Sequence, residues 1–227
     1  MSLQEKLAAF KADFEAGKPP YNMTLPALEL MHRATAELRA SGAADRAIGV
    51  GDTAPAFELK GSHGDSVSSE ALLRKGPLIV SFYRGIWCPY CNIELQALQA
   101  ALPKFEQLNA SLVAISPQTI VNSRRSSDTN KLSFPILCDS QNKVAERFNL
   151  MFTLPDYLAD LYRAAKIDLS VFNADPSWTL PMPARYVIGQ DGVIAYADVN
   201  PDYTLRPEPE AVLPALQKMA AAQTSPT

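Results

Sequence analysis

The amino-acid sequence predicts an α/β protein with a mixed central sheet and helices on both faces of that sheet. Strand patterns and helical patterns alternate between residues 50 and 150, which is typical of a partly parallel sheet. Residues 77–83 (PLIVSFY) form a continuous apolar run, as expected of a central strand buried on both faces. Residues 184–199 contain two strand patterns joined by a Gly/Asp turn, so the last part of the sheet should be antiparallel.

Two helices are predicted before the sheet. Ser2 and Glu5 form an S-x-x-E capping box at the start of a helix over residues 2–16. A second helix is predicted over residues 26–40, and the small, polar residues after it are expected to form a linker. We therefore expect residues 1–45 to be an N-terminal helical extension. The first helix carries an apolar stripe formed by Leu3, Leu7, Phe10 and Phe14.

The main domain is predicted over residues 46–222. Strand and helix alternate three times, and two antiparallel strands and a final helix follow. Residues 150–182 do not fit this order, and we expect them to be an insertion with one short helix within residues 155–167. Residues 61–65 are predicted as a turn. The other predicted strands are 56–60, 111–116 and 134–138, and the other predicted helices are 68–73, 91–108, 119–131, 141–150 and 208–220.

Composition excludes several classes of partner and compartment. The chain has 227 residues and a net charge of -3, so it lacks the basic surplus that attracts nucleic acid or an anionic membrane. No apolar stretch approaches the ~20 residues that a membrane span needs, and the N-terminus lacks the apolar run of a secretory signal. The three cysteines are few and odd in number, which argues against a secreted disulfide framework. These features predict a soluble, cytoplasmic protein.

Cys88 and Cys91 are the first candidates for chemistry. They follow the predicted central strand and begin the long predicted helix, at the edge of an α/β sheet where active sites form. Unpaired N–H groups and the helix dipole favour a negative charge at a helix N-terminus, and they lower the pKa of a cysteine in a C-x-x-C pair. Two cysteines with this spacing can also close a disulfide, so the pair predicts redox chemistry.

The sequence around this pair resembles a known family. Residues 87–91 (WCPYC) resemble the thioredoxin-type redox motif, and GDTAPAFELK, FPILCDSQNKVAERFNL and YVIGQDGVIAY resemble core elements of the peroxiredoxins, the AhpC/TSA family. The resemblance covers residues 49–148 and 183–220. It implies a thioredoxin-like fold and a thiol peroxidase that needs no cofactor. Such an enzyme reduces hydrogen peroxide or an organic hydroperoxide and is recycled by thioredoxin or a similar donor.

The motif departs from the peroxiredoxin pattern at several positions. The P-x-x-x-T-x-x-C pattern of the family places its attacking cysteine on Cys91, its threonine on Cys88 and its proline on Arg84. The family's arginine falls on Pro183, which instead matches the proline, usually cis, that faces the cysteines of thioredoxins. Thioredoxin chemistry therefore implies that Cys88 attacks first, and peroxiredoxin chemistry implies Cys91. Both routes end in a Cys88–Cys91 disulfide that an external dithiol reduces.

Three neighbours of the cysteines are expected to support them. Arg84 can supply the missing positive charge, or it is simply an ion-paired side chain near the loop. Trp87 is expected to shield one side of the site and to offer a surface to a partner. Pro183 is expected to block metal capture and to present backbone to a bound substrate chain.

Alternatives without redox chemistry exist for each group. A zinc site would need Cys138, His32 or His63 in addition, and none of them forms a metal-binding pair. The two cysteines could also be inert buried thiols. We expect Cys138 to be a packing residue and both histidines to lie on the surface. Arg185 and Arg206 are expected to form ion pairs, the latter at the surface.

Two other functions remain open at this stage. One is a thiol–disulfide oxidoreductase acting on protein disulfides, which the WCPYC motif and Pro183 favour. The other is a non-catalytic redox sensor or binding module that uses the N-terminal helices and residues 150–182 as a partner surface. The apolar stripe of the first helix must be covered by its own domain or by a second copy of the chain, so a homodimer is one candidate assembly.

Overall fold

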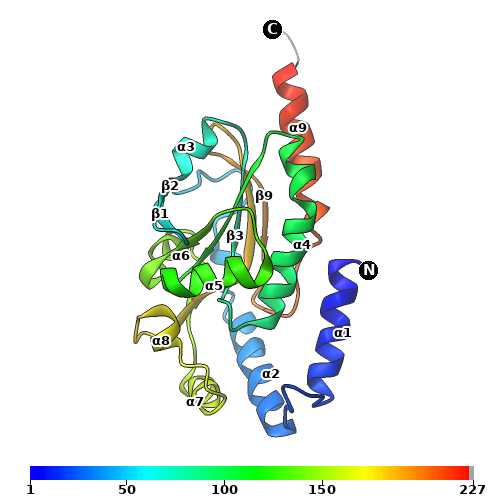
Figure 1. Cartoon of the computed structure of the whole chain (residues 1–227), viewed down its shortest axis with the longest axis vertical. Coiled ribbons are helices and arrows are strands. Elements are labelled where there is room, and N and C mark those ends of the chain that lie inside the picture. Colours follow the sequence, from blue (N-terminus) through cyan, green and yellow to red (C-terminus); the bar gives the residue numbers. More distant parts are fainter. Residues whose placement is uncertain (225–227) are drawn as a thin grey trace.

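A mixed seven-stranded sheet forms the centre of the molecule in the computed structural model, which describes residues 1–224 (Figure 1). The strands are β1 (Glu58–Gly61), β2 (Ser66–Ser68), β3 (Leu78–Phe82), β4 (Ser111–Ser116), β5 (Ile136–Cys138), β6 (Met151–Thr153), β7 (Thr179–Pro181), β8 (Ala184–Ile188) and β9 (Ile194–Val199). The sheet has the order β2-β1-β5-β4-β3-β8-β9. β3, β4 and β5 are parallel, and the other neighbours are antiparallel. The predicted mixed sheet is confirmed.

Helices cover both faces of the sheet. They are α1 (Leu3–Glu15), α2 (Leu25–Ala40), α3 (Ser69–Leu73), α4 (Pro89–Glu106), α5 (Ile120–Asn130), α6 (Lys143–Arg147), α7 (Asp156–Ala164), α8 (Leu169–Asn173) and α9 (Leu213–Thr224). Apolar residues of α1, α4 and α9 pack on one face, and those of α3 and α6 pack on the other. Within residues 1–224, no helix is long and apolar enough to cross a membrane.

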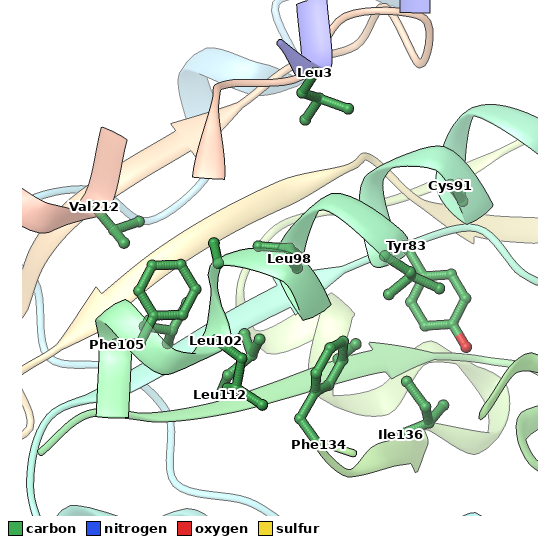
Figure 2. Packing of buried hydrophobic residues seen from close by; sticks show 14 of the residues in the cluster. Leu3, Tyr83, Cys91, Leu98, Leu102, Phe105, Leu112, Phe134, Ile136 and Val212 are labelled. Atoms are coloured by element: carbon green, nitrogen blue, oxygen red, sulfur yellow. The ribbon is translucent and has the colours of Figure 1, made fainter. Parts of the chain in front are cut away.

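Strand β3 is buried on both faces, as its apolar run predicts. Ile79 belongs to the cluster beneath α4, while Val80 and Phe82 belong to the cluster on the opposite face. All five residues of the strand are buried. Figure 2 shows the first cluster, in which Leu98 and Phe105 of α4 lie over the sheet. Each such side chain contributes about 1.5–3 kcal/mol when it leaves water, so this strand is a rigid base for the loop that follows it.

Helix α1 packs on its own chain. Its capping box is present, because the Ser2 hydroxyl accepts from the Glu5 N–H and the Glu5 carboxylate accepts from the Ser2 N–H. Leu3 and Leu7 are buried in the cluster beneath α4, and the Phe10 ring lies 4.9 Å from the Tyr90 ring. The apolar stripe is therefore covered without a second copy of the chain.

The prediction for residues 150–182 was too simple. This segment holds a two-stranded sheet of β6 and β7 and two helices, α7 and α8, rather than one short helix. Each of the two strands has three residues, which is too short to show a period of two. Strand β2 also has three residues and was not predicted, and Ser68, its last residue, was expected at the start of a helix. Leu158 of α7 packs with Ala34 of α2, so the segment covers the second N-terminal helix.

Candidate active site

The loop between β3 and α4 places the two cysteines at a helix start. Gly85 has a φ of +145°, and a Cβ on it would lie 2.6 Å from the Trp87 Nε1 atom. The Cys88 N–H donates to the Gly85 carbonyl at 3.1 Å, which closes the turn. The Ile86 N–H donates to the Gln118 side-chain oxygen at 2.9 Å. Cys88 is the N-cap of α4 as a result, and Cys91 lies in its first turn.

The two thiols are both buried and differ in their access to a cavity. Cys88 is 1% exposed, Cys91 is 0% exposed, and both are free thiols. Cys88 lines a cavity of about 540 Å³ together with Trp87 and Tyr90 of its own loop and helix. Cys91 is not one of the described residues that line this cavity, and it belongs to the same buried cluster as Tyr83 (Figure 2). A small molecule in the cavity would therefore meet Cys88.

The surroundings shift the pKa values of the two thiols in opposite directions. Burial raises the pKa of Cys88, but a hydrogen bond from the Cys91 thiol and the charges of Arg84 and Arg206 outweigh burial and lower it to about 6. Burial and the neighbouring Cys88 raise the pKa of Cys91 well above its ordinary value, against the two arginines. At neutral pH this arrangement holds Cys88 as a thiolate and Cys91 as a thiol that donates to it.

Arg84 supplies positive charge from the end of β3, and it is not an ordinary ion-paired side chain. The Arg84 residue is 3% exposed, and its guanidinium donates to the Tyr162 hydroxyl at 2.5 Å. Three aromatic rings surround it, with centroids at 4.1 Å (Tyr203), 4.8 Å (Trp87) and 5.8 Å (Tyr162) from its central carbon. No ion pair within residues 1–224 includes Arg84. The alternative in which a carboxylate neutralises it is therefore wrong.

The expectation of a surface ion pair for Arg206 is also wrong. Arg206 is 4% exposed, and its Nε donates to the Glu94 carboxylate at 2.6 Å. Arg185 donates to the other oxygen of the same carboxylate at 2.6 Å. The Arg206 Nη2 atom lies 3.7 Å from the Cys91 sulfur. One carboxylate thus holds two guanidinium groups beneath the cysteines, and the prediction that Arg185 is ion-paired is confirmed.

One signal in the sequence could have revealed this network. Glu94 follows Cys91 by three residues and precedes Leu95 on α4, so it lies on the buried face of that helix. A carboxylate on a buried face requires a cation, and this requirement predicts an arginine from elsewhere. No pattern in the sequence indicates which arginine it is, because Arg206 lies 112 residues away in an irregular segment.

Trp87 and Pro183 lie on different sides of Arg84. Trp87 lines the cavity of Cys88, and its ring lies 5.5 Å from the ring of Tyr162. Pro183 lines a second cavity of about 470 Å³ that Arg84 also lines. Within residues 1–224 the only cis peptide bond precedes Pro20. The bond before Pro183 is therefore trans, and the expected match to the cis-proline of thioredoxins is wrong at this point.

The remaining candidate residues lie elsewhere. Cys138 is the last residue of β5 and is half-buried. Its sulfur lies 3.2 Å from the Ser123 hydroxyl. His32 is exposed and lies 2.8 Å from the Glu15 carboxylate, and His63 is exposed in the turn between β1 and β2. The structure places both histidines on the surface, as predicted.

Sequence comparison connects this arrangement to known proteins. Residues 50–197 match the family model described as the AhpC/TSA family. The chain is 33% identical over 99 residues to the putative peroxiredoxin bcp of Helicobacter pylori, an alignment that covers 44% of this chain and 64% of that protein. It is 32% identical over 104 residues to the peroxiredoxin Bcp of Bacillus subtilis, with 45% of this chain and 65% of that protein covered. The chain therefore spans slightly less than two thirds of the length of these relatives.

Solved structures share the fold. The crystal structure of peroxidoxin BcpB from Mycobacterium tuberculosis has a TM-score of 0.60 at 21% identity, covering 78% of this chain and 99% of that chain. A mutant of peroxiredoxin 6 from Arenicola marina has a TM-score of 0.62 at 16% identity, covering 78% of this chain and 76% of that one. At these identities the likeness shows the fold alone, which is the predicted thioredoxin-like α/β fold with two helices, α1 and α2, at its N-terminal end.

Proposed function

The chain belongs to the AhpC/TSA family, and from that membership we propose that it is a thiol peroxidase that works through a Cys88–Cys91 dithiol–disulfide cycle. Its substrate is hydrogen peroxide or an organic hydroperoxide. The observation that carries the proposal is the position of Cys88, a thiol with a lowered pKa that lines a cavity and accepts a hydrogen bond from its partner cysteine. The thiolate is the nucleophilic form of cysteine.

The reaction follows from the two protonation states. The Cys88 thiolate attacks one peroxide oxygen, the O–O bond breaks, and Cys88 becomes a sulfenic acid. The Cys91 thiol gives its proton to the leaving oxygen, which departs as an alcohol or as water. The Cys91 thiolate then attacks the sulfenic sulfur, and the displaced hydroxide takes a proton from solvent to become water. The product is the Cys88–Cys91 disulfide.

Arg84 and Arg206 act on the charge of the thiols. Both cations stabilise negative charge on either sulfur, so they support the Cys88 thiolate before attack and the Cys91 thiolate after proton transfer. We keep a thioredoxin-like dithiol as the proposed donor that reduces the disulfide. We also keep residues 1–45 as an extension and 46–222 as the catalytic domain, with residues 150–182 as an insertion that supplies Tyr162.

Burial favours a peroxide over a protein disulfide as the oxidising substrate. Cys88 is 1% exposed and lies beside a cavity suited to a small molecule. A peptide chain that carries a disulfide would need a wide opening to reach this sulfur. The thiol–disulfide oxidoreductase is therefore the second candidate, and the lowered pKa of Cys88 at a helix start is the observation that favours it.

Single-cysteine variants test which sulfur reacts. We expect Cys91→Ser to consume one equivalent of hydrogen peroxide rapidly in stopped-flow mixing and to stop at a sulfenic acid that dimedone labels. We expect Cys88→Ser to react at least ~30-fold more slowly at pH 7. Burial still raises the pKa of Cys91 in this variant, and a thiol with a pKa above ~8.5 is at most a few per cent thiolate there.

Each opposite result has a definite meaning. Fast reaction of Cys88→Ser would assign the attack to Cys91, whose sulfur lies 3.7 Å from Arg206. If the reduced wild type reacted no faster than free cysteine while it turned over insulin disulfides, the peroxidase proposal would fail and the oxidoreductase would replace it. A reversible disulfide without turnover in either assay would support the redox sensor.

A further inference from the structure

Arg84 separates two cavities that lie on different sides of it. The first is the 540 Å³ cavity lined by Cys88. The second, of about 470 Å³, lies between α2 and the segment around β6 and α7, and none of its described lining residues is a cysteine. Four residues line both cavities, so the guanidinium and its aromatic neighbours form the shared wall: Met31, Arg84, Tyr162 and Tyr203.

No carboxylate among residues 1–224 forms an ion pair with Arg84. Its Nε atom is buried and has no hydrogen-bond partner in the described part of the chain, and none of the ion pairs formed there includes it. Aromatic faces attract a cation, but they do not neutralise it, and an unpaired buried charge is costly. The Cys88 thiolate is the group that supplies the opposite charge.

Oxidation removes this partner. A Cys88–Cys91 disulfide carries no charge, so Arg84 then remains buried among three rings without an anion. Any anion that reaches the guanidinium from the second cavity would gain more interaction energy with the disulfide form than with the thiolate form. The two ligands of Arg84, the thiolate and an external anion, therefore compete.

The second cavity has the chemistry of a site for an apolar organic anion. Its walls are mostly apolar, and Leu38, Phe152, Leu154 and Leu158 are among the residues that line it. Its acidic lining residue, Glu37, is exposed and is already engaged by the Tyr157 hydroxyl at 2.6 Å and by Arg33 at 2.7 Å. Apolar walls and one buried cation match a carboxylate with an aliphatic tail better than a small hydrated anion.

We propose that the second cavity binds an apolar carboxylate at Arg84, and that the disulfide form of the protein binds it more tightly than the reduced form. The redox dependence rests on the proposed Cys88–Cys91 cycle, whereas the site itself does not. Coupling is reciprocal, so a bound carboxylate would stabilise the disulfide by the same factor. The ligand would thus act as a regulator that holds the protein in its oxidised state.

Calorimetric titration with octanoate at pH 8 tests the site and its redox link separately. We expect the Kd to be about tenfold or more lower for the disulfide form than for the reduced wild type, within the usual 5- to 150-fold range of such couplings. The Cys88→Ala variant should bind like the disulfide form, and this arm needs no peroxide chemistry. The neutral probe 1-octanol should show no difference between the forms.

Matched variants locate the ligand. Thr153 and Ala165 are both exposed, and each lines only one of the two cavities, the second and the first respectively. Thr153→Trp should weaken octanoate binding at least tenfold, while Ala165→Trp should leave it unchanged. Arg84→Gln should abolish the difference between Cys88→Ala and the parent background.

Three results would overturn the proposal. They are no binding of octanoate to any of the forms, an equal Kd for the reduced wild type and Cys88→Ala, and loss of binding in the Ala165→Trp variant alone. The last result would place the ligand in the cavity of Cys88 instead. A protein that fails to react with peroxide but still shows tighter binding in Cys88→Ala would contradict the proposed function and leave the carboxylate site standing.

Discussion

At the scale of single residues, the pKa values of Cys88 and Cys91 shift in opposite directions, downward for Cys88 and upward for Cys91. Both are buried, and burial alone would raise the pKa of each. The two pKa values differ because the hydrogen bond between the thiols stabilises the thiolate of the acceptor and the protonated form of the donor. Cys88 receives this bond as acceptor, and Cys91 gives it as donor. The site therefore holds a thiolate and a thiol side by side.

The hydrogen bond between the thiols can be tested by the pH dependence of the peroxide reaction. In Cys91→Ser the serine hydroxyl can still donate to Cys88, so the rate should rise with pH through an apparent pKa near 6 and level off above it. The rate rises because the thiolate is the reactive form. In Cys91→Ala the donor is lost, and the midpoint should move to higher pH. Identical midpoints in the two variants would show that the bond does not set the acidity of Cys88.

At the scale of elements, the turn from β3 into α4 sets the position of both sulfurs. Gly85 adopts a φ that side chains rarely accept, and it lies close against Trp87. The Gln118 side chain, which follows β4, accepts a hydrogen bond from the Ile86 N–H in the same turn. The ends of the parallel strands β3 and β4 and the start of α4 all contact this loop. These contacts fix the backbone of the loop although it has no regular secondary structure.

Replacement of two glycines separates backbone strain from site geometry. Gly64→Ala changes a residue with a φ of +86° and open space around it, and it should cost about 1–2 kcal/mol of unfolding free energy. Gly85→Ala adds a clash with Trp87, so it should cost about 2–4 kcal/mol and raise the pKa of Cys88 as the turn moves. Urea denaturation and the pH profile of thiol alkylation measure the two effects. An unchanged alkylation profile in Gly85→Ala would mean that the turn does not control the thiol.

At the scale of the whole molecule, the Glu94 carboxylate joins three distant parts of the chain. Glu94 lies on α4, Arg185 on β8 and Arg206 in the segment before α9. That last segment is also held by α1, because the Glu208 carboxylate accepts from the Leu3 N–H at 3.0 Å. Hydrogen bonds and ion pairs thus join the N-terminal helix, the sheet, α4 and the C-terminal segment.

Neutralising Glu94 should destabilise the reduced protein as a whole. Glu94→Gln leaves two buried guanidinium groups without an anion, so the free energy of unfolding should fall by about 3–5 kcal/mol in urea titration. The matched control is Glu210→Gln, which breaks an exposed pair with Lys104 and should cost about 0–1 kcal/mol. Equal losses in the two variants would contradict a structural role for the buried network.

Local patterns in the sequence determined much of the fold. The apolar run of β3, the S-x-x-E box of α1 and the period of α4 predicted these elements because side-chain spacing and capping act over a few neighbouring residues. The same local logic predicted two cysteines at a helix start. It missed the three-residue strands around residues 150–182, because such short strands are stabilised by their partner strand rather than by their own pattern.

Only the tertiary structure decided how the two thiols differ. A pKa depends on burial and on the charges brought near a group, and those charges come from Arg84, four residues before Cys88, and from Arg206, more than a hundred residues after it. The roles of Tyr162 and Tyr203 around Arg84 likewise follow from packing between segments far apart in the chain. The sequence by itself therefore determined that two cysteines stand together at a helix start, and the folded chain decided which sulfur carries the charge, because electrostatic interactions act through space and not along the backbone.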